Sequence, residues 1–225
     1  MNVIKQLFEG VKDKEQVHQR FVRLGKGNYE RFYVNVKKGK NLIVKTSFDF
    51  ANDLLGLVAE NIDSEAEISG KIICNYDFEN EMPCEVANFT KRGKLYTAEL
   101  KTTVKPEVLK EIYKKFKLQF LLINVKSERY NLKCAKSLPK PGGKIKDNFC
   151  SATLPLELVD EFAFGIGEFK EAKIKHIVNI TEIEIPEEFK NDSAKARIEA
   201  LRKGVIKRII EIDGKVTEKE TEFSA

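Results

Sequence analysis

Two tyrosines and a group of cationic side chains lie close together near the amino end of this chain. Aromatic rings stack on unpaired bases and Lys or Arg side chains hold phosphates, so these residue types together are typical of surfaces that bind nucleic acid. The residues that we expect to make such contacts are Arg20, Arg23, Lys26, Tyr29, Arg31, Tyr33, Lys37, Lys38 and Lys40. In this interpretation the cations hold phosphates and the tyrosines stack on bases.

The position of the tyrosines depends on a predicted strand over Tyr29–Val36. Successive side chains of a strand point to opposite faces of the sheet. Strict alternation therefore places Phe32, Val34 and Val36 on the core side. It places Tyr29, Arg31, Tyr33 and Asn35 on the other face. The alternative is a solvated meander whose tyrosines cover the edge of the core.

The same segment, Lys26–Val34, is similar to the RNP1 motif of RNA-recognition domains. It departs from that motif at Asn28 and at the inserted Glu30–Arg31 pair, and no matching RNP2 strand precedes it. No family is assigned on this basis. We expect a non-enzymatic nucleic-acid-binding or ribonucleoprotein-associated protein, with RNA favoured over DNA.

Charge along the chain is segregated into blocks, although the formal net charge is only +5. Residues 18–50 hold eight Lys or Arg against two acids, and residues 86–150 hold sixteen against five. Residues 51–85 hold nine acids against one Lys, and residues 151–193 hold ten against four. Blocks of one sign attract polyanions or an oppositely charged partner. The second hypothesis is therefore a self-assembling or scaffold protein whose basic and acidic blocks dock on one another.

Composition indicates a folded chain, since 42% of its 225 residues are hydrophobic and 33% are charged. The four cysteines have no C-x-x-C spacing, so we expect reduced thiols and neither a disulfide framework nor structural zinc. No apolar run resembles a signal peptide or a membrane span, which favours a cytoplasmic protein without membrane contact.

Hydrophobic periodicity predicts an α+β fold with a largely antiparallel sheet, an N-terminal β-meander and a C-terminal β-hairpin. The meander comprises 17–24, 29–36 and 41–46, after a short helix near the N-terminus. The hairpin, 205–212 with 215–223, turns at Asp213-Gly214, a sequence typical of type I′ turns. A helix is predicted over 194–203, with Gly204 ending it.

Three strand–helix–strand units are predicted at intervals of roughly 50 residues, a spacing that hints at duplication. Their helices lie near 48–61, 106–117 and 155–165, and each has an apolar stripe that suits packing on a sheet. A division into 1–85, 86–193 and 194–225 follows, although one continuous domain fits the same pattern. The Pro- and Gly-rich loop 137–146 is a second candidate junction.

Enzyme chemistry has little support in the sequence. There is no P-loop, no G-x-G-x-x-G and no G-x-S-x-G motif, so no catalytic residue, metal or cofactor is assigned. Glu182 and Glu184 could bind a hard cation, but charged residues on an edge strand explain them better. His176 suits a structural role within a strand.

Overall fold

The computed structural model describes residues 26–117, 119–136, 149–158, 168–192, 196 and 199–224, with residues 28–32 and 49 described by their backbone alone. The strands in this part of the chain are β1 (Gly27–Lys38), β2 (Leu42–Ser47), β3 (Ala66–Cys74), β4 (Ala87–Arg92), β5 (Leu95–Val104), β6 (Phe120–Lys126), β7 (Asn131–Ala135), β8 (Phe149–Leu154), β9 (Glu171–Glu184), β10 (Leu201–Ile212) and β11 (Lys215–Ser224). The α-helices are α3 (Ala51–Asn61) and α4 (Pro106–Phe116). Short 3-10 turns occupy Phe48–Phe50, Glu79–Glu81, Leu156–Leu158 and Glu187–Phe189.

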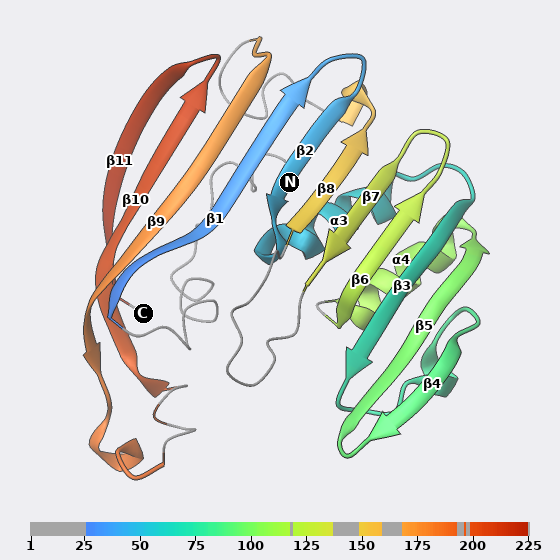
Figure 1. Ribbon diagram of the computed structural model, residues 1–225, viewed down its shortest axis with the longest axis horizontal. Helices are drawn as coiled ribbons and strands as arrows, with labels where there is room; N and C mark the ends of the chain where they lie inside the picture. The colour runs from blue at the N-terminus through green and yellow to red at the C-terminus, as the bar shows by residue number, and fades with distance from the viewer. Residues whose placement is uncertain are drawn as a thin grey trace.

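All eleven strands belong to one twisted sheet in the order β11-β10-β9-β1-β2-β8-β7-β6-β3-β5-β4. Every neighbouring pair is antiparallel, and Figure 1 shows the strands running side by side across the molecule. The β7–β8 pair joins a half built from β3 to β7 to a half built from β1, β2 and β8 to β11. Strands from all three predicted sequence segments therefore share this sheet.

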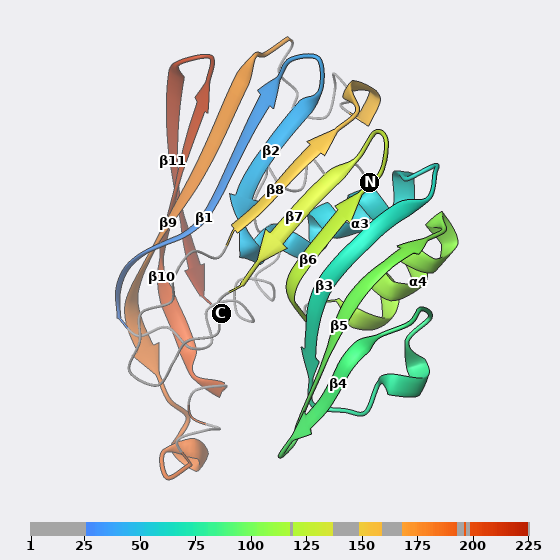
Figure 2. The same ribbon diagram turned by 45° about the vertical axis from the view of Figure 1, so that its right-hand side comes forward.

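Both α-helices cover the same face of the sheet, as Figures 1 and 2 show. Helix α3 buries Leu54 and Val58, and α4 buries Leu109 and Ile112, because their apolar residues recur at helical spacing. Pro106 at the start of α4 suits the first helical turn, where no backbone hydrogen bond is lost. Each such side chain contributes roughly 1.5–3 kcal/mol when it leaves water.

The opposite face of the sheet, called here the open face, carries no described helix. The strands reflect this difference, since β2, β3, β7 and β8 alternate buried and more exposed residues. On β3, for example, Ile68 and Ile72 are buried while Glu67 and Lys71 are exposed. A period of two is what a sheet with one covered face requires.

The predicted antiparallel sheet and C-terminal hairpin are confirmed. The predicted α+β class is confirmed only in part, because the described residues form eleven strands and only two α-helices. Positive φ angles at Asp213 (46°) and Gly214 (83°) form the hairpin turn. The second and third strands of the predicted meander are the β1–β2 hairpin. Its first strand and the predicted N-terminal helix fall outside the described residues.

The strand–helix–strand units are confirmed only in part. The first two exist as β2–α3–β3 and β5–α4–β6. In the sheet, β2 and β3 are not neighbours, because the three strands β8, β7 and β6 lie between them. The third unit contains β8 and β9, but most of its predicted helix, like loop 137–146, lies outside the described residues.

Two further predictions are wrong. Gly204 does not end a helix, because β10 begins at Leu201 and Gly204 pairs with Ile180 of β9. Cys134 and Cys150 are not reduced thiols. They are directly opposed on β7 and β8 and form a disulfide. Cys74 and Cys84 are free. Within the described residues, no helix combines the length and apolar character needed for a membrane crossing.

We predict that Gly204→Ala destabilises the pairing of β9 with β10. A Cβ atom at this position would lie 2.0 Å from the backbone oxygen of Asn179, so one strand must shift. Overpacking of this kind costs about 1–3 kcal/mol. Thermal unfolding should show a midpoint lowered by several degrees. Gly39→Ala is the control, since its Cβ would approach no atom closer than 3.9 Å, and an equal loss in both variants would contradict the expectation.

Candidate nucleic-acid interface

Strand β1 lies inside the sheet between β9 and β2, so the predicted surface is part of a continuous face. Its alternation is interrupted, however, by a register shift between Glu30 and Phe32. Tyr29 is opposite Val178, whereas Tyr33 is opposite Lys175. Opposed residues of antiparallel strands share a face, and these two partners are three positions apart. The backbone thus places positions 29 and 33 on opposite faces, contrary to the predicted alternation.

The other predicted contact residues are distributed around this strand. Lys37 is exposed and on the open face, in the same register series as Tyr33 and Asn35. Lys40 is exposed in the turn that follows β1, and Lys38 is half-buried at the strand end. Lys26 is exposed just before β1. Arg20 and Arg23 lie outside the described residues, and the side chain of Arg31 is not described.

A row of directly opposed polar residues crosses the open face almost from edge to edge. Its members, here called the lysine row, are Lys173 (β9), Asn35 (β1), Lys45 (β2), Ser151 (β8), Lys133 (β7), Asn124 (β6), Ser69 (β3) and Lys101 (β5). Each is the register partner of the next. Neighbouring strands lie about 4.8 Å apart, so Lys45 and Lys133 are separated by roughly 10 Å.

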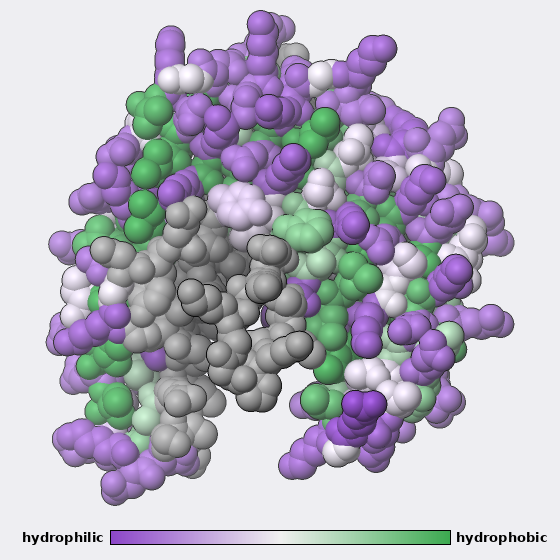
Figure 3. All heavy atoms as spheres, in the orientation of Figure 1, coloured by the Kyte–Doolittle hydropathy of each residue, from purple (hydrophilic) through white to green (hydrophobic). Residues whose placement is uncertain are grey.

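The centre of the open face carries cations and no described acid. Its positions on β1 from Tyr33 to Lys37, and on β2, β8, β7 and β6, are Tyr33, Asn35, Lys37, Ile43, Lys45, Ser47, Phe149, Ser151, Thr153, Asn131, Lys133, Ala135, Leu122, Asn124 and Lys126. Lys45, Lys101 and Lys133 are exposed and form no ion pair with any residue in the described ranges. Around Lys45 and Lys133 no described acid on the same or an adjacent strand of this face cancels the positive potential, whereas Lys101 has Glu99 two residues away on β5. Hydrophilic side chains predominate over the upper part of this face in Figure 3.

A second row follows the first, two residues along each strand and therefore about 7 Å away. This aromatic row comprises Lys175, Tyr33, Ser47, Phe149, Ala135, Leu122 and Lys71. Tyr33 and Ser47 each lie one position beyond the opposed pair Val34–Thr46. Tyr33 and Phe149 are both half-buried on this face. The centre of the open face thus combines a polar, cationic row with a largely apolar one.

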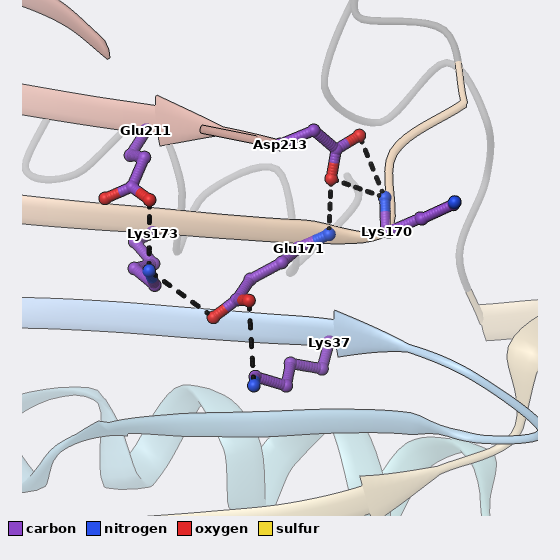
Figure 4. Close-up of polar contacts among 6 residues, drawn as sticks. All are labelled: Lys37, Lys170, Glu171, Lys173, Glu211 and Asp213. Carbon is purple, nitrogen blue, oxygen red and sulfur yellow. Dashed lines mark hydrogen bonds and ion pairs between the residues drawn. The ribbon is translucent and has the colours of Figure 1, made fainter. Parts of the chain in front are cut away.

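A network of charges forms the border of the open face at β9 and β10, as Figure 4 shows. Glu171 contacts Lys37 and Lys173, each at 3.6 Å, and Lys173 donates to Glu211 at 3.0 Å. The hydrogen bond to Glu211 raises the pKa of Lys173. These pairs are solvent-exposed, so they contribute little to stability. Their effect is to compensate Lys37 and Lys173 at this border.

The turn between β10 and β11 is fastened to the start of β9 by Asp213. Its carboxylate accepts hydrogen bonds from the N–H groups of Glu171 at 2.8 Å and Lys170 at 2.9 Å. These two donors lower the pKa of Asp213. The N–H of Asp213 donates in return to the carbonyl oxygen of Glu171 at 2.9 Å. Asp213 therefore helps to hold Glu171 within the border network.

The second basic block of the sequence is divided between the two faces. Lys133 is on the open face, whereas α4, with Lys110 and Lys114, lies on the other side of the sheet. Arg129 is compensated, since it contacts Asp63 at 2.9 Å and also Glu157. The helix lysines therefore cannot act together with the lysine row on one ligand surface.

A scan against protein-family models and searches of curated proteins and of solved structures find no match to this chain. The interpretation of the site therefore depends on its own geometry. The contact set predicted from the sequence includes Tyr33 and Lys37. Lys45 and Lys133 belong to the basic blocks but were not placed in that set, and Lys101 and Phe149 were not singled out. Alternation within each strand indicated their face, but no signal in the sequence gave the order of the strands.

We predict that Asp213→Asn lowers the thermal unfolding midpoint at neutral pH, because the charged acceptor for two backbone N–H groups is lost. A lowered pKa in the folded state means that the charged form stabilises the fold above the ordinary Asp pKa of about 3.9. This contribution disappears as the pH falls through the lower folded-state pKa. The difference between wild type and variant should therefore shrink in acid.

The control for this measurement is Glu188→Gln, an exposed carboxylate without an ion pair inside the described ranges. Its unfolding curve should match that of the wild type at every pH. A difference for Asp213→Asn that stays constant from neutral to strongly acid pH would contradict the role of the carboxylate charge.

Proposed function

We propose that this protein binds nucleic acid on the open face of its sheet, with RNA preferred over DNA. The single observation that carries the proposal is the lysine row. Register brings Lys45, Lys133 and Lys101 from three distant segments into one line with no acid among its central positions. Lysines in a line that are not paired with acids remain available to bind the phosphates of a nucleic-acid backbone.

The polar residues between the lysines support the preference for RNA. Ser151 separates Lys45 from Lys133, and Asn124 and Ser69 separate Lys133 from Lys101. The amide of Asn124 donates to the Ser69 hydroxyl at 3.1 Å, and both groups keep further hydrogen-bonding capacity. Hydroxyl and amide groups can donate to and accept from a ribose 2′-OH, which DNA lacks.

Of the predicted contact residues, Tyr33 and Lys37 belong to this surface in the proposal, and Lys38, Lys40 and Lys26 extend it at the ends of β1. Lys37 shares Glu171 with Lys173, so a phosphate must compete with that carboxylate. Within the described ranges, no carboxylate forms an ion pair with Lys45, Lys101 or Lys133. These three lysines should therefore contribute more to phosphate binding than Lys37.

The decisive variant is the triple substitution Lys45→Gln, Lys101→Gln and Lys133→Gln. Binding of a fluorescent single-stranded RNA, followed by anisotropy at about 0.05 M salt, should weaken on the order of 100-fold. The salt dependence should also become shallower, because each lost phosphate contact removes about 0.7 from the slope of log K against log salt. A single-stranded RNA should bind more tightly than a DNA of the same sequence.

The matched control replaces Lys105, Lys110 and Lys114, which removes the same charge from the start and surface of α4 on the other side of the sheet. This variant should bind RNA nearly as well as the wild type. Equal losses in the two triple variants would show that net charge, and not the open face, determines binding. Absence of binding by the wild type at low salt would refute the proposal.

The self-association hypothesis has one supporting observation. Edge strand β11 presents Glu218, Glu220 and Glu222 at alternate positions, in register with the open-face residues of β10. A second copy could place its lysine row against these carboxylates, although Glu218 already contacts Lys207. Light scattering distinguishes this alternative, since such oligomers should dissociate as salt screens the charges. A monomer at low salt would exclude them.

A further inference from the structure

The proposed function leaves open whether the ligand is single- or double-stranded, and the spacing of the two rows on the open face addresses this question. The lysine row and the aromatic row run parallel across β1, β2, β8, β7 and β6, two residues apart on every strand. Two residues of a strand span about 7 Å. Cationic positions and ring-bearing positions are therefore kept at a constant separation.

This arrangement fits a nucleic acid whose phosphates and bases are reached from the same side. In a single strand the backbone can follow one line while unstacked bases turn onto a neighbouring line of rings. A duplex has its bases stacked and paired inside, with phosphates outward on both strands. Tyr33 and Phe149 would then contact no base, and the aromatic row would have no function in binding.

We propose that the open face binds single-stranded RNA laid across the strands, with phosphates along the lysine row and bases toward Tyr33 and Phe149. This inference depends on the proposed function, because it specifies the ligand of the same surface. The direction follows from the register: from β9 to β7, lysines recur on every second strand of the row, at Lys173, Lys45 and Lys133. Tyr33 and Phe149 occupy the neighbouring row on β1 and β8.

The length of the lysine row sets the size of the site. From Lys173 on β9 to Lys101 on β5 the row crosses β1, β2, β8, β7, β6 and β3, a path of about 34 Å at the usual spacing between strands. A stacked single strand advances about 3.4 Å per nucleotide, so at most about ten nucleotides fit. Bases that unstack onto the rings lengthen the strand and reduce that number.

Carboxylates lie near both ends of the lysine row. At one end Lys173 is bound to Glu171 and Glu211, beyond which β11 presents its glutamates. At the other end Glu99 lies two residues from Lys101 on β5 and accepts a hydrogen bond from Asn88 at 2.7 Å. Carboxylates at both ends repel phosphates, so a longer strand gains no contact on the sheet.

The experiment compares four probes by anisotropy: single-stranded RNAs of increasing length, an RNA duplex, the matching single-stranded DNA and inorganic polyphosphate of equal charge. Affinity for RNA should rise with length and level off by about ten nucleotides. The single strand should bind at least tenfold more tightly than the duplex or the polyphosphate. A duplex or polyphosphate that binds as tightly as the single strand would overturn the inference while leaving polyanion binding intact.

The rings are tested by Tyr33→Leu and Phe149→Leu, which keep an apolar side chain so that the fold is preserved. Each should weaken binding to RNA about tenfold, as loss of a base–aromatic contact does, and leave the salt slope unchanged. Binding to polyphosphate should not change. Ile43→Ala, on the open face but outside both rows, is the control. Leucine variants that bind RNA like the wild type would contradict the inference, whereas failure of all four probes would refute the proposed function itself.

Discussion

The structure depends on continuous antiparallel pairing across the sheet, and above all on the β7–β8 pair where its two halves meet. Helix α3 packs over this pair, and the Cys134–Cys150 disulfide lies on the same covered side. Because side chains alternate with a period of two, a slip of one residue at this pair would move Lys133 to the covered face. Pairing at β7–β8 therefore decides whether the lysines of the two halves form one line.

The difference between the two faces of the sheet follows from this pairing. Apolar residues of α3 and α4 need a partner surface, and the alternating strands supply it on one side. The other side carries polar residues that are mostly exposed or half-buried, with Ser47 buried, and it brings together cations from segments far apart in the sequence. Its described acids lie away from the centre: Glu171 and Glu211 compensate Lys37 and Lys173, and Glu67 on β3 is opposite Lys126. Cations thus gather on one face of the sheet. They come from separate strands, however, and not from one intact basic block of the sequence.

Local features of this fold are readable from the sequence, whereas long-range ones are not. Helices α3 and α4 follow from their apolar stripes, and the last hairpin follows from Asp213-Gly214, because short-range physics determines both. The neighbours of β8 and β6 depend on the whole topology, so Lys45, Lys133 and Lys101 could not be brought together in advance. The register shift in β1 also left no signal, and it separates Tyr29 from the face of Tyr33. The disulfide was missed for the same reason, since it requires β7 beside β8.

We propose that RNA contacts the open face, and photo-crosslinking of a short single-stranded RNA to the protein would locate that contact. Peptides identified by mass spectrometry locate the contact without any substitution in the chain. We expect crosslinks at Tyr33 on β1 and Phe149 on β8, and none on α4. Crosslinks restricted to α4 or to the β11 edge would contradict the assignment of the open face as the binding surface.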